Sequence, residues 1–562
     1  MPKCRATDGI SRSLSHSLLL PFRQRLLLPC RPRLVRTLRK SCGGGRVSSG
    51  NRIHKGAVIG ATIALFSVQC IFSSAASAGA HAPGKAVGKN GGITEKAIAQ
   101  HLEKFESIAE AQGGHRASGT PGHRISVDYT ERLLKKAGFT TERQRFPFLY
   151  TETLKEKLTL RDGTSPDVVV TGYSPSTPKG GTERQLAVPG GPRPATGCSA
   201  DDYRGTPVSG RTALVQAGAC DMDTKERVAA DVGAGAVLVA NTGPGELHSW
   251  LAEPGEARIP VGGVSATTGQ RLVREAAAGR PVRLELRSLT ERRTTENLIA
   301  ESPRGDPEHT VVSGAHLDST PDGPGINDNG VAAAVLLESA LSAARAGGPG
   351  PANRQVFAFW GAEEFGLLGS EHYVDALSAP ERERTELYLN LEMIGSPNYA
   401  LFTLDPDATD PVSGQRPAPG SDRIARRLTQ AFAAQGAASR DAPADGRSDY
   451  VPFLAAGIPT GGLYGGSFEA KTQEQAELWG GAAGAPFDAC YHLPCDRTDH
   501  YSPRAALLHG RAFDEVRRHY ARHPLPGPET GENGETGESG EAGESGGAGG
   551  AGTGGGGYAG RD

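Results

Sequence analysis

The stretch HTVVSGAHLDSTPDGPGINDNGVAAAVLLESALSAARAG, residues 309–347, decides the fold by the order of its parts. An apolar strand-like run ends at a histidine, a Gly/Pro-rich loop follows, and a long helical run comes next. The same order repeats in RQVFAFWGAEE (residues 354–364) and SEHYVDAL (370–377). It repeats again in ELYLNLEMIG (386–395) and SDRIARRLTQAFAAQG (421–436). Such alternation predicts an α/β domain built on a mainly parallel sheet.

Imidazole and carboxylate side chains gather at the ends of these strand-like runs. His316 closes the first run, Asp318 is placed to orient its second ring nitrogen, and Asp328 lies in the turn GINDNG. Adjacent Glu363 and Glu364 follow the next run. Alone, a histidine near a strand end is more often structural, and an aspartate before a helix is more often a turn or N-cap residue. Sites in parallel sheets lie at the carboxyl ends of strands, so together these residues favour a functional site.

Two further side chains complete the set. Glu392 closes the apolar run YLNLE, and His492 lies in the loop CYHLPC. Two histidines and three carboxylates can coordinate two zinc ions, and a spare glutamate beside them can act as a general base. The sequence therefore predicts a hydrolytic metal centre.

Composition separates the chain from several protein classes. Its 562 residues are 37% apolar and carry a formal net charge of −2, so more than one domain is expected and nothing in the overall charge favours nucleic acid.

Residues 56–72 form an apolar run before small-residue sites at 76–78 and 80–82. This predicts a basic leader with a signal peptide, residues 1–80, and a secreted protein without stable membrane association. The alternatives are an uncleaved membrane anchor and a translation start near Val47.

Four cysteines lie beyond the leader, as the local pairs Cys198/Cys220 and Cys490/Cys495. Even pairs in a secreted protein predict disulfides. None has the CxxC spacing of a cysteine zinc site, so the metal ligands are expected elsewhere.

The changes in residue pattern along the sequence predict three parts after the leader. Residues 93–150 and 292–523 combine helical and strand-like patterns and form the main domain. Residues 152–290 carry short strand-like runs between Gly/Pro turns, which predicts a β-rich inserted domain. The Gly/Glu-rich tail, residues 524–562, has almost no apolar side chains and is expected to be disordered.

Specific motifs of the main domain closely resemble the secreted bacterial leucine-aminopeptidase type of di-zinc exopeptidase, metallopeptidase family twenty-eight. They are GGHRASGTPG, GAHLDSTPDGPGINDNG, WGAEEFGLLGS, YLNLEMIGSPN, GRSDYVPFLAAGIPTGGL and CYHLPCD. The resemblance covers roughly residues 93–150 and 292–510, and implies the zinc-exopeptidase fold, a mixed sheet sandwiched by helices. Residues 197–241, with Cys198 and Cys220, resemble a protease-associated domain, which is expected to act as a passive lid or to select substrates.

The resemblance assigns the metal ligands. His316 and Glu392 correspond to terminal ligands of one zinc, Glu364 and His492 to ligands of the other, and Asp328 bridges both. Glu392 departs from the family pattern, in which aspartate is usual at this position. Its extra methylene moves the carboxylate by about one C–C bond length, which bears on zinc occupancy and substrate affinity.

The resemblance also assigns the residues that act on the substrate. Glu363 corresponds to the general base, Tyr491 to the group that stabilises the oxyanion, and Arg447 to a substrate anchor. Asp496 and Asp499 lie where some relatives bind calcium, which is a second candidate ion beside zinc.

The implied activity is a zinc-dependent aminopeptidase that removes N-terminal residues, such as Leu and other large apolar ones, from peptides with a free N-terminus. A monomer is expected. Three rivals stay open: a carboxypeptidase of the same fold, a single-zinc glutaminyl cyclase, and a non-catalytic peptide-binding protein with a degraded metal site.

Overall fold

The computed structural model describes residues 92–525, apart from residues 244, 346–349, 408, 410–413, 415 and 443. The predicted leader, its cleavage sites and nearly all of the predicted tail lie outside the described residues. Within the described part, no helix combines the length and the apolar character that a membrane span requires.

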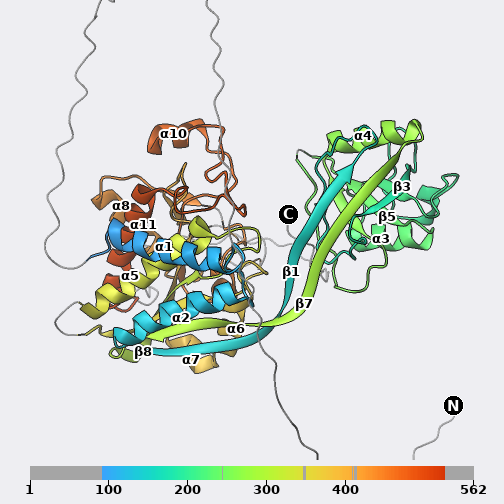
Figure 1. The fold of residues 1–562 in the computed structure, drawn as a ribbon. Coiled ribbons are helices and arrows are strands. Elements are labelled where there is room, and N and C mark those ends of the chain that lie inside the picture. Colours follow the sequence, from blue (N-terminus) through green and yellow to red (C-terminus); the bar gives the residue numbers. More distant parts are fainter. Residues whose placement is uncertain are drawn as a thin grey trace, which may run out of the picture. The chain divides into compact units, whose positions relative to one another are not determined.

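A mixed sheet forms the centre of the main domain (Figure 1). In spatial order its strands are β12 (Arg440–Ala442), β11 (Phe402–Leu404), β13 (Thr460–Tyr464), β10 (Thr385–Glu392), β8 (Asp306–His316), β9 (Asn353–Trp360) and β7 (Pro281–Glu301). The four strands from β13 to β9 are mutually parallel, whereas β11 pairs antiparallel with β13 and β7 pairs antiparallel with β9. The predicted mainly parallel mixed sheet is confirmed.

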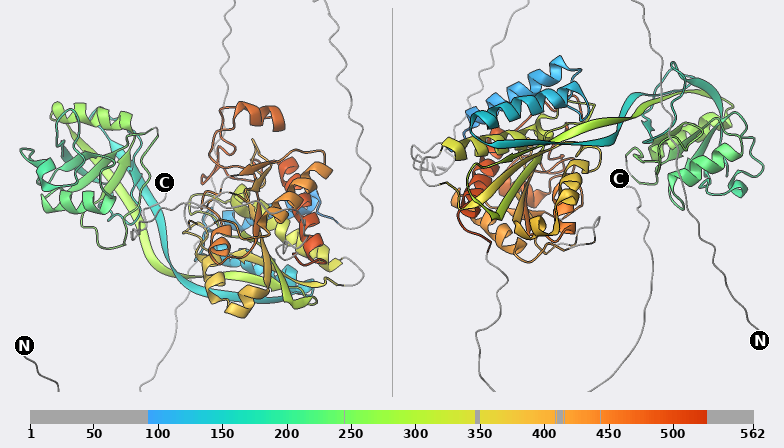
Figure 2. Two further views of the ribbon diagram at one scale, coloured as in Figure 1. Left: turned by 180° about the vertical axis from the view of Figure 1, so that it is seen from behind. Right: turned by 90° about the horizontal axis from the view of Figure 1, so that it is seen from below.

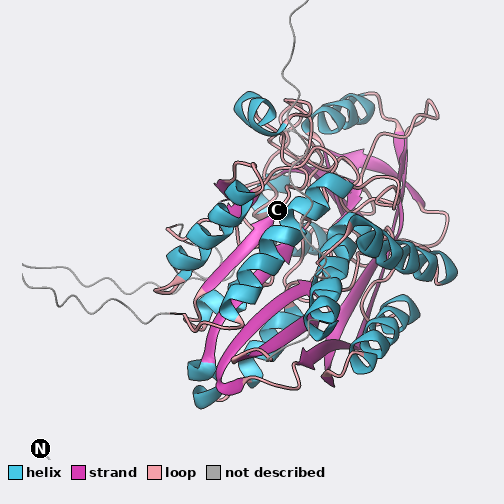
Figure 3. Cartoon of the chain, turned by 90° about the vertical axis from the view of Figure 1, so that its left-hand side faces the viewer, coloured by secondary structure: helices cyan, strands magenta, loops and turns pink. Residues whose placement is uncertain are grey.

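Helices cover both faces of this sheet (Figure 3). Successive side chains of a strand point to opposite faces, so Phe357 and Phe359 of β9 enter one core while Ala358 and Trp360 enter the other. The helices that contribute to the first core are α1 (Glu95–Ala111), α2 (Pro121–Lys136), α5 (Val331–Arg345), α8 (Ser421–Ala434), α10 (Gln473–Trp479) and α11 (Pro503–Tyr520). Those that contribute to the second are α6 (Leu368–Ala376) and α9 (Tyr450–Ala455). The short helix α7 (Ala379–Arg384) completes the domain.

The inserted domain continues the sheet beyond β7, where β3 pairs antiparallel with the start of β7, and it adds helices of its own. Its strands, in spatial order, are β3 (Thr182–Ala187), β4 (Thr212–Gln216), β5 (Ala236–Ala240), β6 (Val261–Val264) and β2 (Val169–Val170). Side chains of these strands form two apolar clusters. One cluster includes side chains of α3 (Met222–Asp231), and the other includes side chains of α4 (Ala266–Ala277). A 3-10 turn lies at Ala200–Tyr203.

Two long strands cross the expected boundaries of the insert. β1 (Thr140–Thr159) pairs antiparallel with β7 from Thr140 opposite Glu301 to Thr159 opposite Arg283 (Figure 2). The positions where the sequence patterns change therefore lie within continuous strands, since a strand can change its surroundings along its length without a loop.

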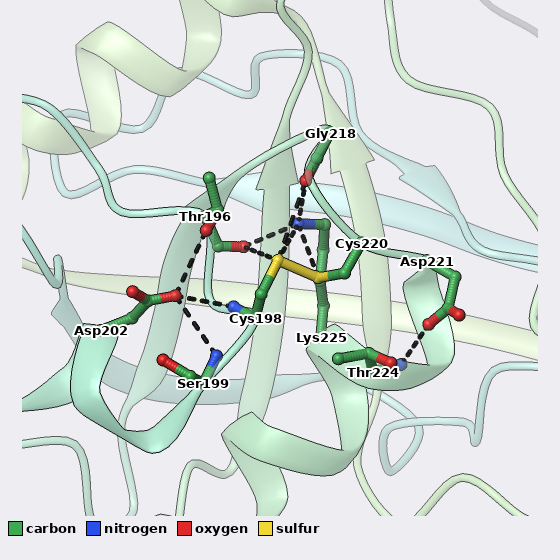
Figure 4. The surroundings of a disulfide bond; sticks show 9 residues. All are labelled: Thr196, Cys198, Ser199, Asp202, Gly218, Cys220, Asp221, Thr224 and Lys225. Atoms are coloured by element: carbon green, nitrogen blue, oxygen red, sulfur yellow. Dashed lines mark hydrogen bonds between the residues drawn. A yellow bond between two sulfur atoms is a disulfide. The ribbon is translucent and has the colours of Figure 1, made fainter.

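The predicted disulfides Cys198–Cys220 and Cys490–Cys495 are both confirmed. Around the first, the buried ammonium of Lys225 donates to the carbonyl oxygens of Thr196, at 2.7 Å, and Gly218, at 2.8 Å (Figure 4). The two cysteine-bearing loops are thus joined by hydrogen bonds as well as by the covalent link.

Candidate metal centre

The site residues come from adjacent strands and the segments that follow them. His316 is the last residue of β8 and Glu392 the last of β10, while Glu363 and Glu364 follow β9. Asp328 lies in the turn Ile326–Gly330, directly before α5, and its own backbone angles are not helical. Because β10, β8 and β9 are parallel neighbours, their carboxyl ends meet at one edge of the sheet.

Five side chains form two potential metal-binding groups that share one carboxylate. In the first, His316 Nε2 lies 3.2 Å from Asp328 Oδ1 and 3.4 Å from Glu392 Oε1. In the second, His492 Nε2 lies 3.1 Å from Asp328 Oδ2 and 3.1 Å from Glu364 Oε2. The two oxygens of Asp328 therefore face different groups, as a ligand that bridges two ions would require.

Burial makes this set of charges costly without a cation. Burial and the nearby Asp328 raise the pKa of Glu364 to about 7, and burial with Glu392 nearby raises the pKa of Glu363 well above its usual range. The pKa of Asp328 is low despite burial, because both imidazoles hydrogen-bond to it. Glu364 Oε1 is also buried without a hydrogen-bond partner among the described residues. Nitrogen and oxygen donors with such a surplus of carboxylates fit zinc.

Asp318 lies beside His316, as expected, but its main chain makes the shorter contact. His316 Nδ1 is 3.2 Å from the carbonyl oxygen of Asp318 and 3.7 Å from its carboxylate. Either acceptor would keep the proton on Nδ1 and leave Nε2 free for a metal.

The loop that carries His492 is tied to the turn that carries Asp328. The Asp496 carboxylate accepts the backbone N–H of Asn327 at 2.7 Å and of Asp328 at 3.1 Å. The loop itself is closed by the Cys490–Cys495 disulfide. Asp496 is thus engaged by backbone donors, and neither potential metal-binding group includes Asp496 or Asp499, so nothing in the described residues supports the calcium expectation.

Arg116 was not predicted to matter for the site. Its buried guanidinium donates to the carbonyl oxygens of Leu317, Pro324 and Gly325, and so holds the loop between His316 and Asp328. The motif GGHRASGTPG contains this arginine, but its contacts are more than 200 residues away in the sequence, so no local pattern reveals them.

A cavity of about 270 Å³ opens beside the candidate ligands. Tyr491 and Arg447 lie in its wall, and Arg447 pairs with Asp445 and Glu469 at 2.7 Å each. The ring of Tyr491 stacks on that of His492, with centroids 3.7 Å apart. The apolar part of the wall includes Phe402, Leu404, Ala442, Leu463 and Phe487.

Comparisons with known proteins agree with this architecture. Residues 297–516 match the model of peptidase family M28, and residues 183–272 match the PA domain. The chain is 39% identical over 441 residues to a probable lipoprotein aminopeptidase, LpqL, of Mycobacterium tuberculosis, a match that covers 78% of this chain and 86% of the relative. It is 37% identical to an aminopeptidase of Pseudomonas aeruginosa, with 74% and 79% covered.

Solved structures share the fold. A zinc aminopeptidase of Bacillus subtilis superposes with a TM-score of 0.55 at 26% identity, and the match covers 76% of this chain and 95% of that one. The aminopeptidase of Aneurinibacillus sp. strain AM-1 also gives a TM-score of 0.55, at 23% identity, with 77% and 97% covered. The mixed sheet, the inserted domain and the relatives all support the same family assignment. This chain belongs to peptidase family M28 and carries a PA domain within it.

Proposed function

We propose that this protein is a secreted, zinc-dependent aminopeptidase that removes large apolar residues from the N-termini of peptides. The observation that carries the proposal is the pair of three-residue groups that share Asp328, with Glu363 beside them. Its relatives named as aminopeptidases support the class of reaction, and its disulfides fit an extracellular protein.

Five residues would hold the metal: His316, Asp328, Glu364, Glu392 and His492. Two bound zinc ions would supply Lewis acidity toward the scissile carbonyl and acidify the attacking water. The remaining steps belong to side chains of this chain.

Glu363 is the proposed general base. Its carboxylate lies 3.8 Å from His316 Nε2, yet it belongs to neither potential metal-binding group. Cations bound by its neighbours would offset the rise in pKa that burial causes, so the ionised carboxylate could accept a proton from the water that attacks the carbonyl carbon. When the C–N bond breaks, the same carboxyl group returns that proton to the leaving amine.

Tyr491 is the proposed donor to the oxyanion. Burial, with Asp328 and Glu364 nearby, raises the pKa of its phenol well above the usual range, so the hydroxyl keeps its proton. A neutral O–H in the cavity wall can stabilise the negative oxygen of the tetrahedral intermediate. Arg447, fixed by two carboxylates in the same wall, is retained as the proposed substrate anchor.

The apolar part of the cavity supports the preference for large apolar N-terminal residues. Two phenylalanines and two leucines of its wall, Phe402, Phe487, Leu404 and Leu463, can bury a leucyl side chain, which contributes roughly 1.5–3 kcal/mol relative to exposure.

A pair of substrates tests the proposal. Release of the anilide from leucine anilide is expected, whereas N-acetyl-leucine anilide should remain intact, and a chelator should abolish turnover until zinc is restored. Cleavage of the acetylated substrate, or turnover that survives complete removal of metal, would contradict the proposal. Release of C-terminal residues from peptides would instead identify the carboxypeptidase alternative.

A further inference from the structure

Glu392 is the end of a chain of hydrogen bonds that runs through the second core. Trp360 Nε1 donates to the hydroxyl of Tyr388 at 3.0 Å, and that hydroxyl donates to Asn390 Oδ1 at 2.9 Å. Asn390 Nδ2 donates to Ser448 Oγ at 2.7 Å, and Ser448 Oγ donates to Glu392 Oε2 at 2.6 Å. Trp360, Tyr388, Asn390 and Ser448 are all buried.

The direction of every bond in this chain is fixed by its two ends. An indole N–H can only donate, so the Tyr388 hydroxyl accepts from Trp360 and gives its own proton to Asn390. The amide oxygen of Asn390 is thereby occupied, which turns its NH₂ group toward Ser448. The serine hydroxyl in turn gives its proton to the carboxylate of Glu392, an acceptor-only group when ionised.

The chain leaves the two oxygens of Glu392 with different partners. Oε2 accepts from Ser448, while Oε1 lies 3.4 Å from His316 Nε2, within the first potential metal-binding group. The ring of Tyr388 is also stacked on Phe453, with centroids 3.7 Å apart and planes 3° from parallel, so the middle of the chain has little freedom to move.

We propose that Trp360, Tyr388, Asn390 and Ser448 are positioning residues that hold Glu392 as a metal ligand. The inference rests on the proposed zinc centre. It also explains how a glutamate can serve at this position, because the longer side chain reaches Ser448 with one oxygen and the metal-binding group with the other. An aspartate, one methylene shorter, is expected to lose one of these two contacts.

Zinc titration of the metal-free protein tests the proposal without relying on activity. Loss of a group that orients a metal ligand typically costs about tenfold to a hundredfold in metal affinity. Ser448→Ala should therefore weaken one of two zinc sites by about that factor, and Tyr388→Phe should weaken the same site. Ser448→Thr retains the hydroxyl donor and should largely preserve the affinity.

Two matched controls separate positioning from loss of stability. Ser339→Ala removes another buried serine hydroxyl bonded to a carboxylate, that of Asp514 at 2.6 Å, outside the metal centre. Tyr373→Phe removes a hydroxyl from a ring that packs beside Trp360 but takes no part in the chain. Both controls should bind zinc as the wild type does, even where they lower the melting temperature.

A double-mutant cycle completes the test. In Glu392→Asp, where one contact is already lost, adding Ser448→Ala should weaken zinc binding much less than it does in the wild type. Wild-type-like zinc affinity in Ser448→Ala, or equal effects of Ser448→Ala in both backgrounds, would overturn the inference while leaving the zinc centre intact. A wild-type protein that binds no zinc would overturn the proposed function, and this inference with it.

Discussion

His509 should make the stability of the protein depend on pH between about 4 and 6.5. The side chain is buried in α11, where Nδ1 lies 3.0 Å from the carbonyl oxygen of Ala505 and the ring meets Phe432 edge-on. Burial lowers the pKa of His509 from 6.5 to about 4, although nearby backbone carbonyls oppose this shift. The folded protein therefore holds a neutral imidazole where the unfolded chain already binds a proton.

The sign and size of the effect follow from this difference. Because the pKa is depressed in the folded state, the unfolded state binds more protons below pH 6.5, so stability falls as the pH drops from about 6.5 toward 4. Between pH 7.5 and pH 4.5 this one residue should lower the free energy of unfolding by about 2.5 kcal/mol. At higher pH it should contribute no slope.

Urea unfolding of the wild type, His509→Asn and His509→Phe at several pH values measures the contribution. Asparagine can still donate to the Ala505 carbonyl but loses the ring, whereas phenylalanine keeps the ring volume but loses the donor. The two variants therefore change the free energy of unfolding at neutral pH for different reasons. Both should lose less stability than the wild type between pH 7.5 and 4.5, by about 2.5 kcal/mol. Curves that run parallel for all three proteins would refute the reasoning.

Three other changes test separate parts of the site. Glu363→Gln should lower kcat by about 10²–10⁴-fold while zinc content stays at the wild-type level, and unchanged turnover would remove Glu363 from the role of base. Replacing Cys490 and Cys495 by serine should weaken zinc binding by freeing the His492 loop, as measured by chelator competition; unaltered affinity would show that the disulfide does not position the loop. Leu404→Trp narrows the cavity and should reduce kcat/KM for leucyl substrates by about 10–200-fold more than for alanyl ones; equal losses would place the substrate side chain elsewhere.

The central fold was predictable because local pattern and topology agree. The run RQVFAFW, residues 354–360, is apolar on both sides, which suits a parallel strand between two helical layers, and alternate residues do enter two cores. The carboxyl ends of such strands meet, so the sequence pattern alone is enough to expect His316 and Glu392 near one another, as they are.

Other features had no local signal. Arg116 supports the Leu317–Gly325 loop through contacts that join distant segments, and an arginine in a Gly/Pro loop looks like a surface residue in sequence. Ser448 lies next to Arg447 in GRSD, yet its bond to Glu392 spans 56 residues. β1 and β7 also obscure the limits of the insert, since their side-chain patterns change while the backbone pairing continues.

Zinc stoichiometry, measured by native mass spectrometry on the wild type and Asp328→Asn, tests the central claim most directly. Both potential metal-binding groups depend on Asp328, so the account predicts two zinc ions per wild-type chain and severe loss of both in the variant. The folded variant should keep the wild-type far-ultraviolet circular dichroism spectrum. A wild-type chain that binds no zinc, or an Asp328→Asn variant that still binds two ions tightly, would contradict a bridged two-zinc centre.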